Sequence, residues 1–171
     1  MDDPAPQRSD VLPLELSQAE IDALLDARLI ANLASINPNG SVHLVAMWFR
    51  REGDALLFPT SRHTRKAKNL RERPQATAMI DQSRAGLDLR GVQIKGSVEL
   101  VEGPEARRLN HSIHERYITP LGLEQDAVAA YLSGGDDVTL RLSIERISSW
   151  NLADRPAGIA LRGNGLVHPL A

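Results

Sequence analysis

The chain has 171 residues, of which 42% are hydrophobic and 25% charged, the profile of one globular domain rather than of a long disordered protein. Its 20 Lys and Arg residues against 22 Asp and Glu residues leave a formal charge of -2, which excludes attraction of nucleic acid or anionic lipid to the whole surface. The absence of cysteine excludes disulfides, thiolate nucleophiles and cysteine-based metal sites, and it fits a reducing compartment. No apolar run approaches the roughly 18 residues of a membrane span, and the first residues are acidic where a secretory signal is basic. We therefore expect a cytoplasmic protein that binds no membrane and no nucleic acid.

The first third of the chain predicts a tail, a helix and three strands. Residues 1–13 contain three prolines without apolar periodicity, so we expect a disordered tail. Ser17 and Glu20 have capping-box spacing and precede apolar residues at helical intervals, which predicts a short amphipathic helix. Apolar runs on either side of the turn sequence at 37–40 predict a hairpin, and a turn at 51–54 adds a third strand at 55–59. With such short connections, we expect these three strands to form an antiparallel meander.

The second strand of this hairpin, residues 42–49, has apolar side chains on both faces. An antiparallel strand normally exposes one face to water. We therefore expect this strand to be covered on one side by a barrel core and on the other by a partner subunit, a helix or a flat ligand.

The segment 60–73 carries six positive charges and one carboxylate, and its helix formers predict a helix over 64–72. Thr60 and Ser61 before this helix, with Arg65 and Lys66 in its first turn, suit a phosphate. A solvated basic helix face is the structural alternative. Nucleic-acid binding is a third interpretation, disfavoured because no aromatic residues are interleaved with the charges and the whole chain is slightly acidic.

The rest of the chain continues the mainly β pattern around one helical region. The predicted strands are 76–80, 89–101 and 137–150, and the predicted helical region is 104–132, with a break at Thr119-Pro120. Gly96 predicts a bend in the second of these strands. Residues 14–152 are therefore expected to form one domain, followed by a C-terminal tail or arm at 153–171.

Few residues in this pattern suggest catalysis by a side chain. His111 and His114 have helical spacing beside Glu115, but without a clear third ligand we predict no metal site. The common hydrolase, nucleotide-triphosphatase, dinucleotide-binding and zinc-protease motifs are absent, so no motif supports a catalytic side chain of these classes. Trp48 and Trp150 each end an apolar strand, where an indole either packs in the core or forms one wall of a slot for a flat ring.

Three strings occur in a fixed order: LASI at 33–36 with NGSVH at 39–43 leading to MWF at 47–49, then LFPTS at 57–61, then RKAKNL at 65–70 closed by Arg73-Pro74. Together they resemble the pyridoxamine 5′-phosphate oxidase-like split β-barrel family, over about residues 17–152. The Trp-Phe strand followed by the Thr-Ser and Arg-Lys-Ala strings is most similar to the branch that uses the deazaflavin coenzyme F420 rather than FMN.

This resemblance implies a fold, an assembly and a cofactor site. The fold would be a six-stranded antiparallel split β-barrel with flanking helices, and the assembly a homodimer with cofactor sites at the subunit interface. By position, the cofactor ring would be lined by Val45, Ala46, Met47 and Trp48. The same resemblance implies that the phosphate is held by Thr60, Ser61, Arg65, Lys66 and Asn69. Members of the family often have proline where this chain has Ala46, a change that loosens the ring pocket.

The resemblance also implies the reaction class. We expect an F420-dependent oxidoreductase that transfers a hydride to an unsaturated small-molecule substrate, with the cofactor supplying the chemistry. The alternatives are an FMN-binding oxidoreductase of the same family and a non-catalytic protein that binds a flavin or a haem.

Overall fold

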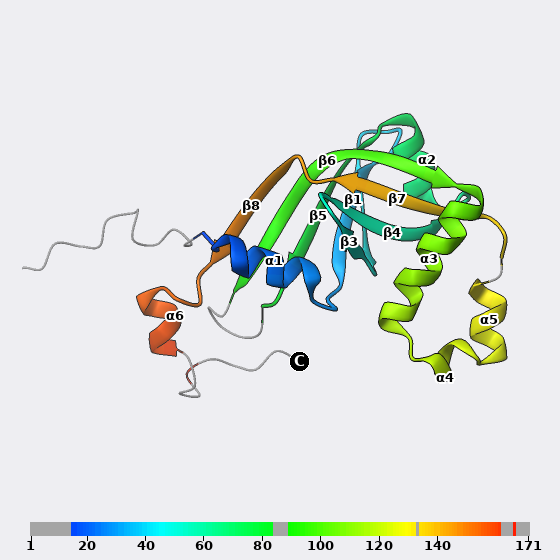
Figure 1. Cartoon of the computed structure of the whole chain (residues 1–171). Coiled ribbons are helices and arrows are strands. Elements are labelled where there is room, and N and C mark those ends of the chain that lie inside the picture. Colours follow the sequence, from blue (N-terminus) through cyan, green and yellow to red (C-terminus); the bar gives the residue numbers. More distant parts are fainter. Residues whose placement is uncertain (1–14, 84–88, 133, 162–165, 167–171) are drawn as a thin grey trace, which may run out of the picture.

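The computed structural model describes residues 15–83, 89–132, 134–161 and 166. Its strands pair antiparallel in the order β2-β1-β5-β6-β7-β4-β3, and β8 pairs with β6 beside this path, so the sheet curls into a half-open barrel (Figure 1). The strands are β1 (Ala31–Ile36), β2 (Val42–Met47), β3 (Arg50–Glu52), β4 (Ala55–Ser61), β5 (Gln75–Asp81), β6 (Arg90–Glu102), β7 (Asp137–Ser143) and β8 (Arg146–Asn151). The helices are α1 (Gln18–Asp26), α2 (Arg65–Glu72), α3 (Gly103–Tyr117), α4 (Pro120–Leu123), α5 (Asp126–Leu132) and α6 (Pro156–Leu161). The predicted antiparallel split barrel with flanking helices is confirmed. The described residues form eight strands instead of six, because the predicted strand 137–150 is divided into β7 and β8 and the short β3 overlaps the turn predicted at 51–54.

The barrel closes over one main apolar core and a smaller one. Phe49, Phe58 and Leu140 are fully buried in the main core, inside the curl of the sheet. On the outer side, Leu109 and Ile113 of α3 pack with Leu57 of β4 in the second core, and Trp48 and Tyr117 lie against it. The second core therefore fixes α3 across the end of the barrel where β2 ends.

The predicted three-stranded meander is wrong at Trp48 and Phe49. There the chain leaves β1, and the short β3 pairs with β4 at the other end of the strand order. The hydroxyl of Tyr117 takes the place of a neighbouring strand at Phe49: it accepts from the Phe49 N–H at 3.3 Å and lies 3.1 Å from the Phe49 carbonyl oxygen. Because these backbone groups are satisfied by a side chain, the ladder ends at Met47 and the chain crosses from one half of the sheet to the other.

The long strand β6 joins the two halves of the sheet, and Gly96 lies where its partner changes. Residues 90–95 pair with β8, whereas 98–102 pair with β7. The chain turns at Ser143, so that its carbonyl oxygen would lie 1.9 Å from a Cβ at Gly96. The predicted strand at 137–150 is divided at this turn, and the bend predicted at Gly96 corresponds to the junction.

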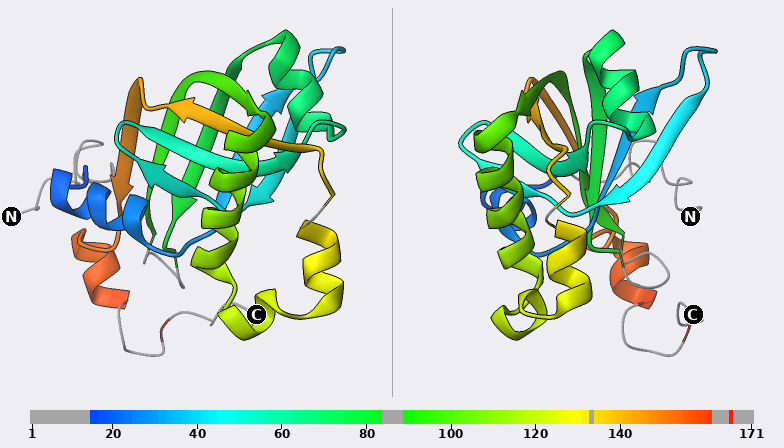
Figure 2. Two further views of the ribbon diagram at one scale, coloured as in Figure 1. Left: turned by 45° about the vertical axis from the view of Figure 1, so that its right-hand side comes forward. Right: turned by 90° about the vertical axis from the view of Figure 1, so that its right-hand side faces the viewer.

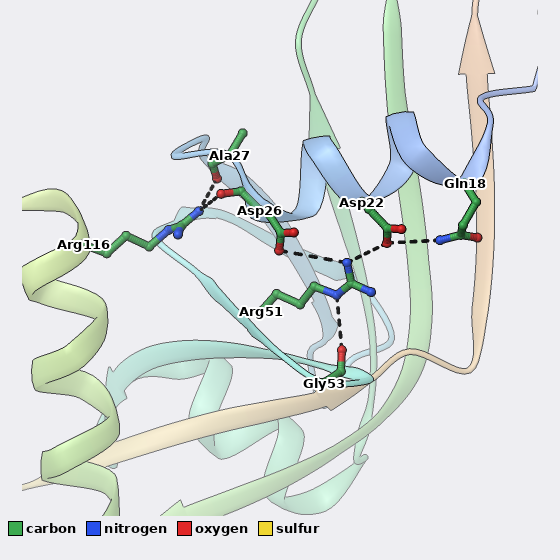
Figure 3. Close-up of polar contacts among 7 residues, drawn as sticks. All are labelled: Gln18, Asp22, Asp26, Ala27, Arg51, Gly53 and Arg116. Carbon is green, nitrogen blue, oxygen red and sulfur yellow. Dashed lines mark hydrogen bonds and ion pairs between the residues drawn. The ribbon is translucent and has the colours of Figure 1, made fainter.

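Two arginines attach α1 to the rest of the fold (Figure 3). Arg51 of β3 donates to the Asp22 carboxylate at 2.7 Å, and this hydrogen bond lowers the pKa of Asp22. Arg116 of α3 donates to the carbonyl oxygens of Asp26 and Ala27, at 2.5 and 2.7 Å, where α1 ends. The capping box predicted from Ser17 and Glu20 is present at the other end of the helix.

The region from α3 to α5 forms an arm at one end of the barrel. Figure 2 shows α3 against the sheet, α4 at the turn of the arm, and α5 returning beside α3. No side chain of α5 is buried, although most of its residues are apolar. None of the described helices is long and apolar enough to cross a membrane.

The predicted terminal segments fall largely outside the description. The expected tail at 1–13 lies wholly outside the described residues, as do residues 84–88 between two of the predicted strands. Within the predicted C-terminal segment, α6 packs through Gly158, where a Cβ would lie 2.3 Å from the carbonyl oxygen of Leu152.

Candidate functional site

A cavity of about 630 Å³ lies between the ends of β2 and β4 and the arm formed by α3 and α5. It has an apolar end, at Met47 and Trp48, and a polar end, at Thr60, Ser61 and Lys66. The remaining lining residues are Ile30, Val45, Ala46, Pro59, Thr64, Asn110, His114, Tyr131, Leu132, Gly134, Asp136 and Asp137. A cavity that is apolar at one end and holds an ammonium group among polar side chains at the other suits a flat ring with an anionic substituent.

Trp48 forms a flat wall at the apolar end. Its indole stacks on the ring of Tyr117, with centroids 5.1 Å apart and planes 4° from parallel. The Tyr117 hydroxyl donates to the carbonyl oxygen of Leu29 at 2.7 Å and also bonds the backbone of Phe49, so the ring beneath Trp48 cannot turn freely. The indole plane is therefore set in advance of any ligand.

His114 meets the same indole edge-on, with the centroids 6.1 Å apart. Burial lowers the pKa of His114, a nearby Asp137 opposes that shift, and His111 adds to it. The lowered pKa leaves this imidazole mostly neutral at pH 7, when it can donate or accept a hydrogen bond but carries little charge.

Lys66 provides the positive charge at the polar end. Its side chain is half-buried, and burial lowers the pKa of its ammonium group. Across the described ranges the ammonium has no hydrogen bond and no ion pair. An anion bound beside this partly desolvated cation would offset the cost of its burial, so Lys66 is a candidate for anion binding.

Hydroxyl groups surround this cation. Thr60 and Ser61 end β4, and Thr64 caps the start of α2 by accepting from the Ala67 N–H at 3.4 Å. The hydroxyls of Thr60 and Thr64 lie 3.0 Å apart, and that of Ser61 donates to the Asp136 carboxylate. The Asp136 carboxylate therefore already uses the Ser61 hydroxyl, which is one of the groups predicted to bind the phosphate.

A buried polar network holds the floor of the cavity. Asn110 donates to the Asp137 carboxylate at 2.8 Å and accepts from the Thr139 hydroxyl at 2.7 Å. Asn110 and Thr139 are 2% and 0% exposed. Their bonds tie α3 to the start of β7 and direct the Asp137 carboxylate toward an amide partner.

The structure brings together most of the residues predicted for the cofactor. Val45, Ala46, Met47, Trp48, Thr60, Ser61 and Lys66 all line the cavity. Arg65 is exposed and lies outside the lining, although it is in the same first turn of α2. Asn69 is 2% exposed and donates to Ser35 and Asn37 at 3.2 and 3.0 Å, so its amide joins α2 to the hairpin of β1 and β2.

Several cavity residues lie outside the predicted set, among them Asn110, His114, Tyr131, Asp136 and Asp137. Asn110, His114 and Tyr117 follow each other at intervals of four and three residues, and this stripe on α3 is a sequence pattern that could have identified two residues of the cavity wall. His111, for which a metal role with His114 was considered, lies 3.4 Å from Glu115, and no group of three candidate ligands exists among the residues described.

The chain is similar in sequence and fold to known proteins. The family described as pyridoxamine 5′-phosphate oxidase matches residues 17–151. A conserved hypothetical protein from Mycobacterium tuberculosis is 31% identical, with 86% of this chain and 90% of that chain covered and a TM-score of 0.67. No curated protein is significantly similar in sequence.

Two further solved structures are similar in fold alone. An F420 reductase is 23% identical, with 74% of this chain and 94% of that chain covered and a TM-score of 0.58. The haem storage protein HutZ from Vibrio cholerae is 17% identical, with 78% and 93% covered and a TM-score of 0.61. One fold thus serves a redox enzyme and a storage protein, and the residues of the cavity must distinguish between such functions.

Proposed function

Because the chain belongs to the pyridoxamine 5′-phosphate oxidase family, we propose that it is an oxidoreductase that binds coenzyme F420 in the cavity between Trp48 and Lys66. The substrate class is an unsaturated small molecule that accepts a hydride. The observation that carries the proposal is the half-buried, unpaired ammonium of Lys66 at one end of a cavity whose other end is a preset indole.

The residues present fit a ring with a phosphate-bearing tail. Val45, Ala46, Met47 and Trp48 would hold the ring, and Thr60, Ser61 and Lys66 would bind the phosphate. Arg65 would act from outside the cavity through its charge, and Asn69 by holding α2 against the hairpin. When bound, the deazaflavin supplies hydride transfer; the chain binds it, orients it and excludes water from it.

Parallel titrations with F420 and FMN, at low and high salt, test the proposal. We expect tighter binding of F420, weakened by salt because a phosphate is held by charge. Preference for FMN would place the protein among the FMN-dependent members. Binding of neither would contradict the proposal and favour a haem or storage role, which a haem titration would check.

An exposed apolar surface on β2 supports the proposed homodimer. Val42 and Leu44 share one face of this edge strand and are 62% and 63% exposed, and Ile36 and Met79 on the adjacent strands are each 37% exposed. The same strand lines the cavity through Val45 and Ala46. A second copy that covers this face would therefore border the cofactor site, as the family resemblance implies.

Leu44→Arg is expected to convert the dimer to a monomer. Placing a charge in an apolar interface should raise the dimer dissociation constant by about a hundredfold, equivalent to losing one buried leucine contact of about 2–3 kcal/mol. Size-exclusion chromatography with light scattering measures the mass. Leu121→Arg is the matched control, because Leu121 is 70% exposed on α4, away from β2. An unchanged mass for the Leu44 variant would place the interface elsewhere.

A further inference from the structure

Asp136 lies at the polar end of the cavity and uses the donors that a bound phosphate needs. Its carboxylate accepts from the Ser61 hydroxyl, and one of its oxygens lies 3.8 Å from Nε2 of His63. The hydrogen bond from Ser61 is the largest of the effects that lower the pKa of Asp136, so the carboxylate is ionised at neutral pH. Any anion bound beside Lys66 would therefore meet a negative charge already in place.

The position of this carboxylate is determined by the sheet. The Arg62 N–H donates to the Asp136 carbonyl oxygen at 3.0 Å, and the next residue, Asp137, pairs with Ser61 where β7 meets β4. Gly135 precedes it with a φ of +72°, a conformation that glycine adopts without strain. The side chain can rotate, but its backbone cannot move away without opening this end of the β4–β7 ladder.

The cavity lining offers one cation, Lys66, which can pair with a single negative charge of a bound ligand but not with two. Lys66 is the one lysine or arginine among the described lining residues, against the carboxylates of Asp136 and Asp137. Asp137 is hydrogen-bonded by the Asn110 amide, whereas Arg62, together with the His63 imidazole, faces Asp136 from outside the cavity. A phosphodiester carries one negative charge, but a phosphate monoester carries close to two at pH 7. The second charge of a monoester would meet repulsion from Asp136 and, among the described lining residues, no cation besides Lys66, because Arg62 and Arg65 lie outside the cavity lining.

We propose that Asp136 determines cofactor specificity, by favouring the phosphodiester of coenzyme F420 over the phosphate monoester of FMN. The inference rests on the proposed function and goes beyond it, because it assigns the choice between the two cofactors to one side chain. It also explains how a cavity able to hold either ring can discriminate between them at the phosphate.

Asp136→Asn tests this, because an asparagine amide oxygen can still accept from Ser61 while the charge is removed. We expect affinity for FMN to rise by about ten- to a hundredfold, the effect of removing a unit charge roughly 6–12 Å from a phosphate charge at an effective dielectric constant of about 20. Affinity for F420 should rise several-fold less, and affinity for riboflavin, which lacks phosphate, should not change. Asp54→Asn is the matched control, since Asp54 is exposed in the turn between β3 and β4.

A pH series gives a second readout that a purely structural role would not change. In the wild type, the ratio of FMN to F420 affinity should rise as pH falls from about 7.5 to about 5.5, because the monoester gains a proton near pH 6 while Asp136 stays ionised. His63 and His114 would act on both phosphates alike, so the ratio of the two affinities isolates the second charge. In Asp136→Asn the ratio should change less with pH.

The outcomes separate this inference from the proposed function. If Asp136→Asn changed the affinities for F420, FMN and riboflavin equally, or left the ratio of FMN to F420 affinity unchanged, the specificity role would be overturned. The proposal that the wild type binds the cofactor would still stand. Failure of the wild type to bind any of the three would overturn the proposed function, and the specificity role with it.

Discussion

Substitution of Lys66 by methionine is expected to weaken binding of F420 and FMN by about ten- to a hundredfold, the loss of one charge-assisted hydrogen bond worth about 1.5–3 kcal/mol. The free protein should not be destabilised. Burial already lowers the pKa of Lys66, so the ammonium is less favourable in the folded protein than in water. Methionine keeps the length and apolar stem without that cost, and the melting temperature should stay the same or rise.

Lys68→Met is the matched control for this experiment. Lys68 lies on the same helix and is exposed, so its substitution removes the same charge without touching the cavity. We expect it to leave cofactor affinity within about twofold at physiological salt, where exposed charges are screened. Isothermal titration with F420, FMN and riboflavin provides the measurement. An equal loss in both variants, or a loss of riboflavin binding, would show that Lys66 does not act at the phosphate.

Gly96→Ala is expected to destabilise the fold by more than about 4 kcal/mol, which is at the upper end of single substitutions. The new Cβ would lie 1.9 Å from the Ser143 carbonyl oxygen and 3.0 Å from its carbonyl carbon, and both are backbone atoms. The corner cannot move aside easily, because the Glu145 carboxylate there accepts from the Ser97 N–H at 2.9 Å and from the Ser97 hydroxyl at 2.5 Å. Relief of the clash would require separating β7 from β6.

Urea denaturation followed by circular dichroism measures this effect. Gly40→Ala makes the same chemical change at the tip of the hairpin, where no atom lies within 4 Å of the new Cβ and only the positive φ of 83° is unfavourable. We expect Gly40→Ala to lower the free energy of unfolding by about 1–2 kcal/mol. A Gly96 variant as stable as the Gly40 variant would mean that the junction of β6, β7 and β8 is more adaptable than the backbone contacts indicate.

The elements predicted correctly from sequence are those whose determinants are local. The capping box of Ser17 and Glu20, the hairpin turn at 37–40 and the helix formers of α2 are each contained in a short stretch of sequence, and all three elements are present. The break after β2 was missed because it depends on the hydroxyl of Tyr117, 68 residues further along the chain. The pairing of β4 with β7 joins residues as distant as Ser61 and Asp137, and local periodicity contains no information on such a pairing.

The same distinction applies to the candidate site. The residues on β2, β4 and the start of α2 were predicted because the family strings cover them. Other residues reach the cavity only through the tertiary fold. Asp136 directly precedes β7, and Asn110 and His114 lie on α3. Asn69 is the opposite case. The family resemblance predicts that it binds the phosphate, but its side-chain amide donates to the β1–β2 hairpin, a contact that the sequence does not indicate.

The strand β6 has a consequence for how the protein unfolds. One continuous strand of 13 residues pairs with β5, β7 and β8, so each half of the split barrel shares it with the other. Neither half can lose its hydrogen bonds to β6 without exposing the core that the other half also covers. We therefore expect the barrel to melt in a single cooperative transition, while α5, which buries no side chain, exchanges its amide protons through local opening at far lower free energy.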